Sequence, residues 1–169
     1  ISACLVGSEM CIRDSYLTGK SAEGFKRSPG FVADTLEMTG CWKDLPKIYD
    51  EVVAAINAVP GTLAGSAHQS HAYIDGACLY FSLRGDVDVE RRGAWYRAAW
   101  DAANAVLVRH NAALSHHHGV GLLRAPYMRD SLGSAFPILE AVKSALDPDN
   151  LLNPGKLGLS PDMPRDAKR

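Results

Sequence analysis

The chain contains 169 residues, carries a formal net charge of −1 at pH 7, and is 47% hydrophobic and 22% charged. This is the composition of an ordinary globular domain that is long enough to bury a core of its own. The small net charge gives no reason to expect nucleic acid as a partner, and no apolar run reaches the roughly 18 residues that a membrane-spanning helix needs.

The N-terminal residues differ in kind from the rest of the chain. Residues 5–15, LVGSEMCIRDS, resemble the translation of a sequencing-library adaptor of the transposon-end kind, and the alternative is a genuine N-terminal segment. Residues 1–15 are therefore expected to be non-native and to have no part in the predicted fold, and the opening with Ile1 rather than Met indicates an incomplete reading frame. Cys41 and Cys78 then remain, and their spacing favours neither a disulfide framework nor a zinc site, so a reduced, cytoplasmic setting is expected, with or without peripheral membrane attachment.

The first predicted elements are a strand, a helix and a second strand. Residues 34–39 alternate polar and apolar side chains, which predicts a short strand. Apolar residues then recur at helical spacing, which predicts an amphipathic helix with a stripe of Leu45, Ile48, Tyr49, Val52, Val53 and Ile56. Pro60 and Gly61 end this helix. Residues 62–73 are rich in small and polar side chains and predict the second strand.

The third predicted strand, residues 77–83, has two chemically distinct faces. Asp75-Gly76 predicts the turn before it, so the two strands form an antiparallel hairpin. Its apolar face carries Ala77, Leu79, Phe81 and Leu83, and its opposite face carries Cys78, Tyr80 and Ser82. The hairpin is therefore expected to turn its apolar back to a core and its polar front away from it.

The remaining elements are helical. Residues 89–111 predict a long helix with a buried stripe of Trp95, Ala99, Ala102 and Val106. Residues 115–121, SHHHGVG, predict a loop, and residues 133–146 predict a further helix with Phe136, Leu139, Val142 and Leu146 on one face. The polar residues 160–169 are expected to be disordered. This order predicts an α+β fold, an antiparallel sheet covered by helices on one face, with a C-terminal helical segment.

Two features carry candidate chemistry. His116, His117 and His118 are adjacent imidazoles that titrate near neutral pH, and Gly119 beside them lets the backbone approach a ligand closely. A solvated histidine-rich loop and a metal site are the alternatives, although no spaced carboxylate or cysteine partners are evident. Tyr80, on the outer face of its strand, can transfer a proton if neighbouring cations stabilise its anion, and the alternative is a packed interface tyrosine.

Three stretches together resemble a known family: YIDGACLYF, SHHHGVGLLRAPYM and ALDPDNLLNPGKLGL. They are similar to the C-terminal domain of FAD-linked oxidases of the vanillyl-alcohol-oxidase type, and within them to the alkyldihydroxyacetonephosphate (alkylglycerone-phosphate) synthases of ether-lipid synthesis. The resemblance runs from about Asp34 to Leu159. It implies that residues 16–159 form a ferredoxin-like cap domain that faces the substrate and is incomplete at its N-terminal side.

The resemblance also implies roles for individual residues. Tyr80 matches the tyrosine that takes part in deprotonating the substrate, and the active-site histidines match His116, His117 and His118, of which His117 is the best candidate to work with Tyr80. The implied reaction replaces the acyl chain of acyl-dihydroxyacetone phosphate with a fatty alcohol, through an adduct of the substrate with flavin N5 and without net redox change. The implied cofactor is FAD, to which His116, His118 and Gly119 contribute contacts, and no metal is expected.

Other parts of the family pattern are not found in this sequence. No stretch resembles the flavin-binding domain, which is expected N-terminal to this region and supplies most FAD contacts, so the chain alone is expected to be inactive. The arginine that holds the substrate phosphate is also expected upstream, and neither Arg84 nor Arg124 is assigned that role.

Two alternatives remain open. The ending NPGKL is more typical of general flavin oxidases than of the lipid synthases. The first alternative is a flavin dehydrogenase of 2-hydroxy acids from the same superfamily. That branch is expected to carry histidines and a metal near the strand turn, where this chain has Tyr73 and Tyr80. It is also expected to have one histidine before the GxG, not three. The second alternative is a non-catalytic α+β binding module. The expected partner is a lipid-like or hydroxy-acid small molecule, and a homodimer is among the expected assemblies.

Overall fold

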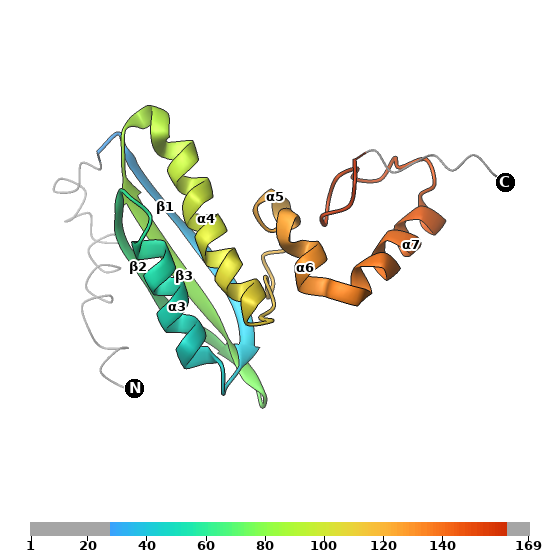
Figure 1. The fold of residues 1–169 in the computed structure, drawn as a ribbon, viewed down its shortest axis with the longest axis horizontal. Helices are drawn as coiled ribbons and strands as arrows, with labels where there is room; N and C mark the ends of the chain where they lie inside the picture. The colour runs from blue at the N-terminus through green and yellow to red at the C-terminus, as the bar shows by residue number, and fades with distance from the viewer. Residues whose placement is uncertain (1–27, 162–169) are drawn as a thin grey trace, which may run out of the picture.

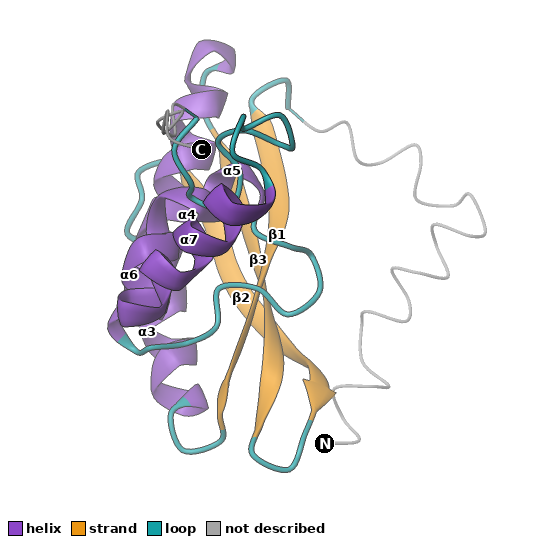
Figure 2. Ribbon diagram, turned by 90° about the vertical axis from the view of Figure 1, so that its right-hand side faces the viewer, coloured by secondary structure: helices purple, strands orange, loops and turns teal. Residues whose placement is uncertain are grey.

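The computed structural model describes residues 28–161, so the expected non-native segment and nearly all of the expected disordered tail lie outside the described residues. Three antiparallel strands form one sheet, two long helices cover one of its faces, and short helices lead away from it (Figures 1 and 2). The elements in chain order are β1 (Phe31–Cys41), α3 (Leu45–Asn57), β2 (Thr62–Ala72), β3 (Gly76–Asp86), α4 (Arg92–Arg109), α5 (Gly121–Arg124), α6 (Met128–Leu132) and α7 (Phe136–Leu146). The predicted α+β class is confirmed.

The sheet has the order β1-β3-β2, and both pairings are antiparallel. This is the order of the first β-α-β-β-α part of a ferredoxin-like arrangement. At the outer edge of β1, a single bridge joins Thr39 to Ala113 and takes the place where a fourth strand would pair. β1 has 11 residues, longer than the predicted 34–39, because β3 offers it a partner residue along its whole length.

The core lies between the sheet and the two long helices. β3 alternates as predicted, and its core-facing side chains Ala77, Leu79, Phe81 and Leu83 are all buried. From the helices, the core receives Leu45, Ile48, Val52, Ile56, Trp95, Ala99, Val106 and Leu107. Tyr49 and Ala102, also predicted for the buried stripes, lie at their margins, with Tyr49 38% exposed.

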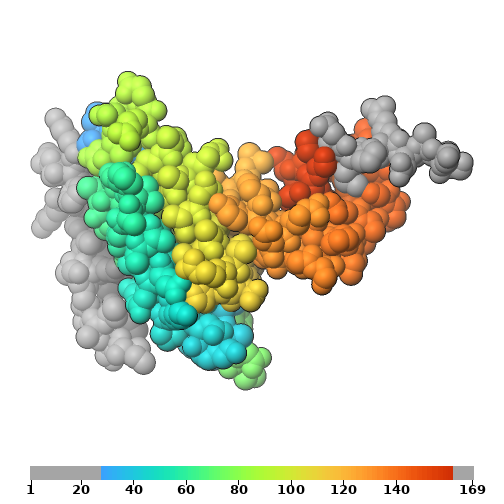
Figure 3. Space-filling view, viewed as in Figure 1, coloured from blue at the N-terminus to red at the C-terminus, as the bar shows by residue number. Residues whose placement is uncertain are grey.

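The C-terminal segment forms the predicted helix but leaves most of its apolar face exposed. The predicted helix over residues 133–146 begins with one 3₁₀ turn and continues as α7, but only Phe136 of its predicted apolar face is buried. Val142 is 49% and Leu146 is 78% exposed, because α6 and α7 project from the body of the sheet and no described element covers that face (Figure 3). No helix among residues 28–161 is long and apolar enough to cross a membrane.

Candidate active site

The face of the sheet opposite α3 and α4 carries polar side chains in rows across the strands. Glu37 of β1 pairs with Tyr80 of β3, and Tyr80 pairs with His68 of β2. Residues that pair directly across antiparallel strands point to the same face, so these three side chains form one row. In the neighbouring row, Cys78 pairs with His71.

A bulge in β2 places both histidines on this face. The register between β2 and β3 shifts between Gln69 and His71, which leaves one extra residue in β2. Without that extra residue, His68 and His71 would point to opposite faces, because side chains alternate along a strand. The bulge therefore places the His71 imidazole, as well as that of His68, on the same face of the sheet as Tyr80.

The histidine loop reaches the same face through the end of α4. The helix ends at Arg109, and Asn111 then takes a left-handed backbone conformation with φ of 51°, which asparagine tolerates better than most residues. Ala113 follows and exchanges two backbone hydrogen bonds with Thr39 of β1, at 3.2 and 2.9 Å. This bridge brings the chain alongside β1 just before the three histidines.

Glu37 fixes the conformation of the loop. Its Oε1 accepts hydrogen bonds from the backbone N–H groups of His116, His117 and His118 at 2.6–2.7 Å and from the hydroxyl of Ser115 at 2.7 Å. Glu37 is fully buried, and burial alone would raise its pKa. The hydrogen bonds from the loop outweigh burial and lower the pKa of Glu37 to about 2, so the carboxylate is charged at neutral pH.

Arg124 of α5 holds the other side of the loop. Its Nε donates to the carbonyl of Leu114 at 2.6 Å, and its Nη1 donates to the carbonyl of Gly119 at 3.1 Å. The guanidinium is 5% exposed and lies 4.8 Å from the ring centroid of Trp100. Arg124 thus supports the backbone on both sides of the histidines.

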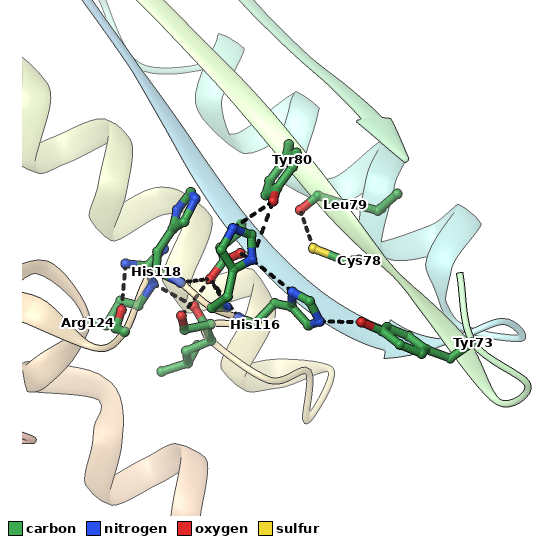
Figure 4. Close-up of polar contacts among 12 residues, drawn as sticks. Tyr73, Cys78, Leu79, Tyr80, His116, His118 and Arg124 are labelled. Carbon is green, nitrogen blue, oxygen red and sulfur yellow. Dashed lines mark hydrogen bonds and ion pairs between the residues drawn. The ribbon is translucent and has the colours of Figure 1, made fainter. Parts of the chain in front are cut away.

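The loop side chains and two tyrosines form a continuous polar chain (Figure 4). The Tyr80 hydroxyl lies 3.1 Å from Nε2 of His117, and Nδ1 of His117 lies 2.9 Å from Nδ1 of His116. Nε2 of His116 lies 2.5 Å from the Tyr73 hydroxyl. The His118 ring stacks on Tyr80 with centroids 5.6 Å apart and an interplanar angle of 8°. The structure therefore brings Tyr80 and all three predicted histidines together, and their catalytic roles stay predictions.

Gly119, predicted to contact a cofactor, lies in the exposed part of the loop. Its φ is 78°, a conformation that favours glycine, and no described atom lies within 4 Å of the position that a side chain would occupy. The loop therefore leaves room for a ligand at Gly119, and its cofactor contact stays a prediction.

The sequence reasoning missed three members of this cluster. Glu37 alternates with the apolar Leu36 and Met38, a pattern that predicts a place on the outer face of the strand and gives no signal that the histidine loop buries it there. The His68 and His71 rings lie 5.4 and 6.3 Å from the Tyr80 ring, but their common face depends on the bulge, for which the sequence gives no clear signal.

Two groups of three side chains could offer ligand atoms to a metal, since the ligand atoms of each group lie within 4.8 Å of one another. The first group is His71, Cys78 and His116, and the second is Glu37, His117 and His118. Burial, with the charge of Glu37, raises the pKa of the Cys78 thiol, and a neutral thiol is a poor ligand. In the second group, Oε1 of Glu37 already accepts four hydrogen bonds, and Oε2 lies 2.9 Å from Nδ1 of His117. The contacts form a hydrogen-bonded cluster, and the expectation of no metal stays a prediction.

The family model for FAD linked oxidases, C-terminal domain, matches residues 11–157. The chain belongs to this family. The family that was predicted from the three motifs is thereby confirmed, and membership in this FAD-linked family implies FAD as a cofactor. Within the domain, the Tyr80–histidine cluster lies on the face of the sheet that the described helices leave open.

Several curated relatives of this FAD-linked oxidase domain have known names. The chain is 33% identical over 132 residues to an alkyldihydroxyacetonephosphate synthase of Trypanosoma brucei brucei, covering 76% of this chain and 21% of that protein. It is 28% identical over 137 residues to the uncharacterized FAD-linked oxidoreductase YgcU of Escherichia coli K12, covering 76% of this chain and 28% of that protein. It is 32% identical over 93 residues to a D-2-hydroxyglutarate dehydrogenase of Pseudomonas putida, covering 55% and 9%.

The domain thus spans about a fifth to a quarter of the length of the first two relatives. A solved structure of alkyldihydroxyacetonephosphate synthase aligns with a TM-score of 0.48 at 20% identity, covering 75% of this chain and 21% of that one.

Proposed function

We propose that this domain is the substrate-facing part of a FAD-dependent enzyme that exchanges the acyl chain of acyl-dihydroxyacetone phosphate for a fatty alcohol. The observation that carries the proposal is the contact of 3.1 Å between the Tyr80 hydroxyl and Nε2 of His117, on an open sheet face. The first-named relative is an alkyldihydroxyacetonephosphate synthase, which supports this choice of substrate.

The residues present fit a flavin as one wall of its site. His117 is 49% exposed and His118 is exposed, so the imidazoles border open space beyond the sheet. His116, His118 and Gly119 would line this wall, while a part of the enzyme outside this domain would supply most contacts to FAD. When bound, FAD supplies an electrophilic centre that none of the side chains of this domain provides.

The proposed task of the cluster is proton transfer. Removing a proton from the carbon next to a ketone requires a base within hydrogen-bonding distance. The Tyr80 oxygen acts as that base, and Nε2 of His117 receives the tyrosine proton and returns it later. His116 and Tyr73 continue the row of polar contacts toward the turn between β2 and β3: Nδ1 of His116 lies 2.9 Å from Nδ1 of His117, and its Nε2 lies 2.5 Å from the Tyr73 hydroxyl.

A second candidate is a flavin dehydrogenase of a D-2-hydroxy acid. The identity of 32% to a D-2-hydroxyglutarate dehydrogenase favours it, because the same imidazoles can accept the proton of a substrate hydroxyl. A non-catalytic binding module would use neither chemistry.

The test is a substrate comparison with the longer flavoprotein that contains this domain. Purified enzyme is given acyl-dihydroxyacetone phosphate with a long-chain alcohol, or a D-2-hydroxy acid with an electron-accepting dye. The proposal predicts alkyl product in the first assay and loss of on the order of 10²–10⁴-fold of that activity in Tyr80→Phe, with FAD retained. Dye reduction alone would establish the dehydrogenase, and turnover in neither assay would leave the binding module.

A further inference from the structure

Glu37 contacts the cluster from β1 with two oxygens in different surroundings. Oε1 accepts four hydrogen bonds from residues 115–118, which accounts for the fold of the loop. Oε2 is buried and accepts no hydrogen bond of good geometry from any described residue, yet it lies 2.9 Å from Nδ1 of His117. A buried carboxylate oxygen costs free energy unless a donor or a positive charge satisfies it.

We propose that Glu37 is a positioning residue, which holds a proton on Nδ1 of His117 through Oε2 and thereby turns the free Nε2 lone pair toward Tyr80. This inference rests on the proposed role of Tyr80 as the base and adds a third member to the pair. The order across the site is then the Glu37 carboxylate, the His117 imidazole and the Tyr80 hydroxyl. Glu37 acts through His117 and does not itself touch the substrate.

The ring geometry explains why the carboxylate matters. A neutral imidazole carries one proton, on Nδ1 or on Nε2, and the partner of one nitrogen decides the role of the other. The Tyr80 hydroxyl lies 3.1 Å from Nε2 of His117 and 3.4 Å from Nδ1, so Nε2 is the nearer nitrogen, and with the proton on Nδ1 it accepts the Tyr80 proton. The imidazolium that forms then lies beside the buried anion, which stabilises the pair of tyrosinate and imidazolium.

Other ionisable groups also face the His117 ring and contribute to the charge around it. His116 places its Nδ1 2.9 Å from Nδ1 of His117, and the His118 ring lies 4.6 Å from the His117 ring. From β2, the His71 ring lies 5.6 Å away. These groups are neutral bases or cations, and the Cys78 thiol on β3 is held neutral by burial and by Glu37. Glu37 is therefore the negative charge that faces the ring among the described residues.

Two substitutions separate this role from that of holding the loop. Glu37→Gln keeps an amide oxygen that can accept bonds from the loop, but it removes the charge and can present an N–H group to Nδ1 of His117. Ser115→Ala is the matched control, because it removes one of the four hydrogen bonds to Oε1 and leaves Oε2 and His117 in place.

The experiment is ¹⁵N NMR of the histidine rings in the 169-residue chain, recorded for the wild type and both variants at a pH at which the rings are neutral. It requires neither FAD nor substrate, so its outcome is independent of whether the proposed reaction is correct. The wild type should show neutral His117 with its proton on Nδ1. In Glu37→Gln, the proton of neutral His117 should move largely to Nε2, because the variant amide can present an N–H group to Nδ1, while Ser115→Ala should keep the wild-type tautomer.

Two results would overturn the assignment. One is a Glu37→Gln spectrum in which neutral His117 keeps its proton on Nδ1, or a Ser115→Ala spectrum with the same change of tautomer as Glu37→Gln, since Glu37 would then only hold the loop. The other is a wild-type spectrum with the neutral His117 proton on Nε2, a result that decides the question even if Glu37→Gln does not fold.

Discussion

The acid sensitivity of the fold should depend on Glu37. Its pKa of about 2 in the folded chain lies below the ordinary value of 4.5, because the loop N–H groups bind the charged form. A lowered folded-state pKa contributes stability above pH 4.5 and loses that contribution as pH falls toward 2. A difference of about 2.5 pH units corresponds to about 3 kcal/mol in the free energy of unfolding, as an order of magnitude.

Urea unfolding of the wild type and of Glu37→Gln, at several pH values from 7 to about 2, measures this contribution. Between about pH 5 and pH 2, the wild type should lose about 3 kcal/mol more than the variant, which has no carboxylate to titrate at this position. Glu51 also has a pKa of about 2, through His110 and Arg109, but both proteins keep it, so its effect cancels in the comparison. The difference should persist in high salt, because the Glu37 carboxylate is buried. Parallel stability curves for the two proteins would refute this reasoning.

Two further predictions concern packing. Phe81→Ala should lower the free energy of unfolding by about 3–5 kcal/mol, because the ring is fully buried in the core. The control Leu63→Ala, at a residue that is 61% exposed, should change it by less than about 1 kcal/mol. Equal losses in urea unfolding would contradict the assigned core. Gly85→Ala should destabilise the chain by about 1–3 kcal/mol or more, because the new methyl group would lie 2.3 Å from the Trp95 ring. The control Gly93→Ala in α4 meets no described atom within 4 Å, so it should be neutral or stabilising by up to about 1 kcal/mol. Thermal unfolding that ranks the two variants in the reverse order would show that this packing is wrong.

The position of Tyr80 could be predicted because β3 is half-buried. A strand has a period of two, so burying Leu79 and Phe81 leaves one direction for the tyrosine between them. The helices α3 and α4 were predictable for the same kind of reason, since their apolar stripes repeat over several turns.

The partners of Tyr80 were harder to predict because they depend on tertiary contacts. The hydrogen bonds between Glu37 and the histidine loop join residues 78 to 81 positions apart, and no local pattern encodes such a contact. The exposed face of α7 shows a second limit, since helical periodicity identifies an apolar stripe but not what covers it. The short helices α5 and α6, of four and five residues, have too few turns to give a periodic signal.

The central claim is that Tyr80, assisted by His117, removes a proton from the substrate. Its most direct test is the rate of deuterium uptake from D₂O at the carbon next to the ketone of acyl-dihydroxyacetone phosphate, measured by mass spectrometry with the longer flavoprotein. Tyr80→Phe should slow this exchange by on the order of 10² or more, whereas Tyr49→Phe, which removes a hydroxyl from α3 on the other side of the sheet, should exchange at the wild-type rate. Wild-type exchange in Tyr80→Phe, with FAD bound, would contradict the claim.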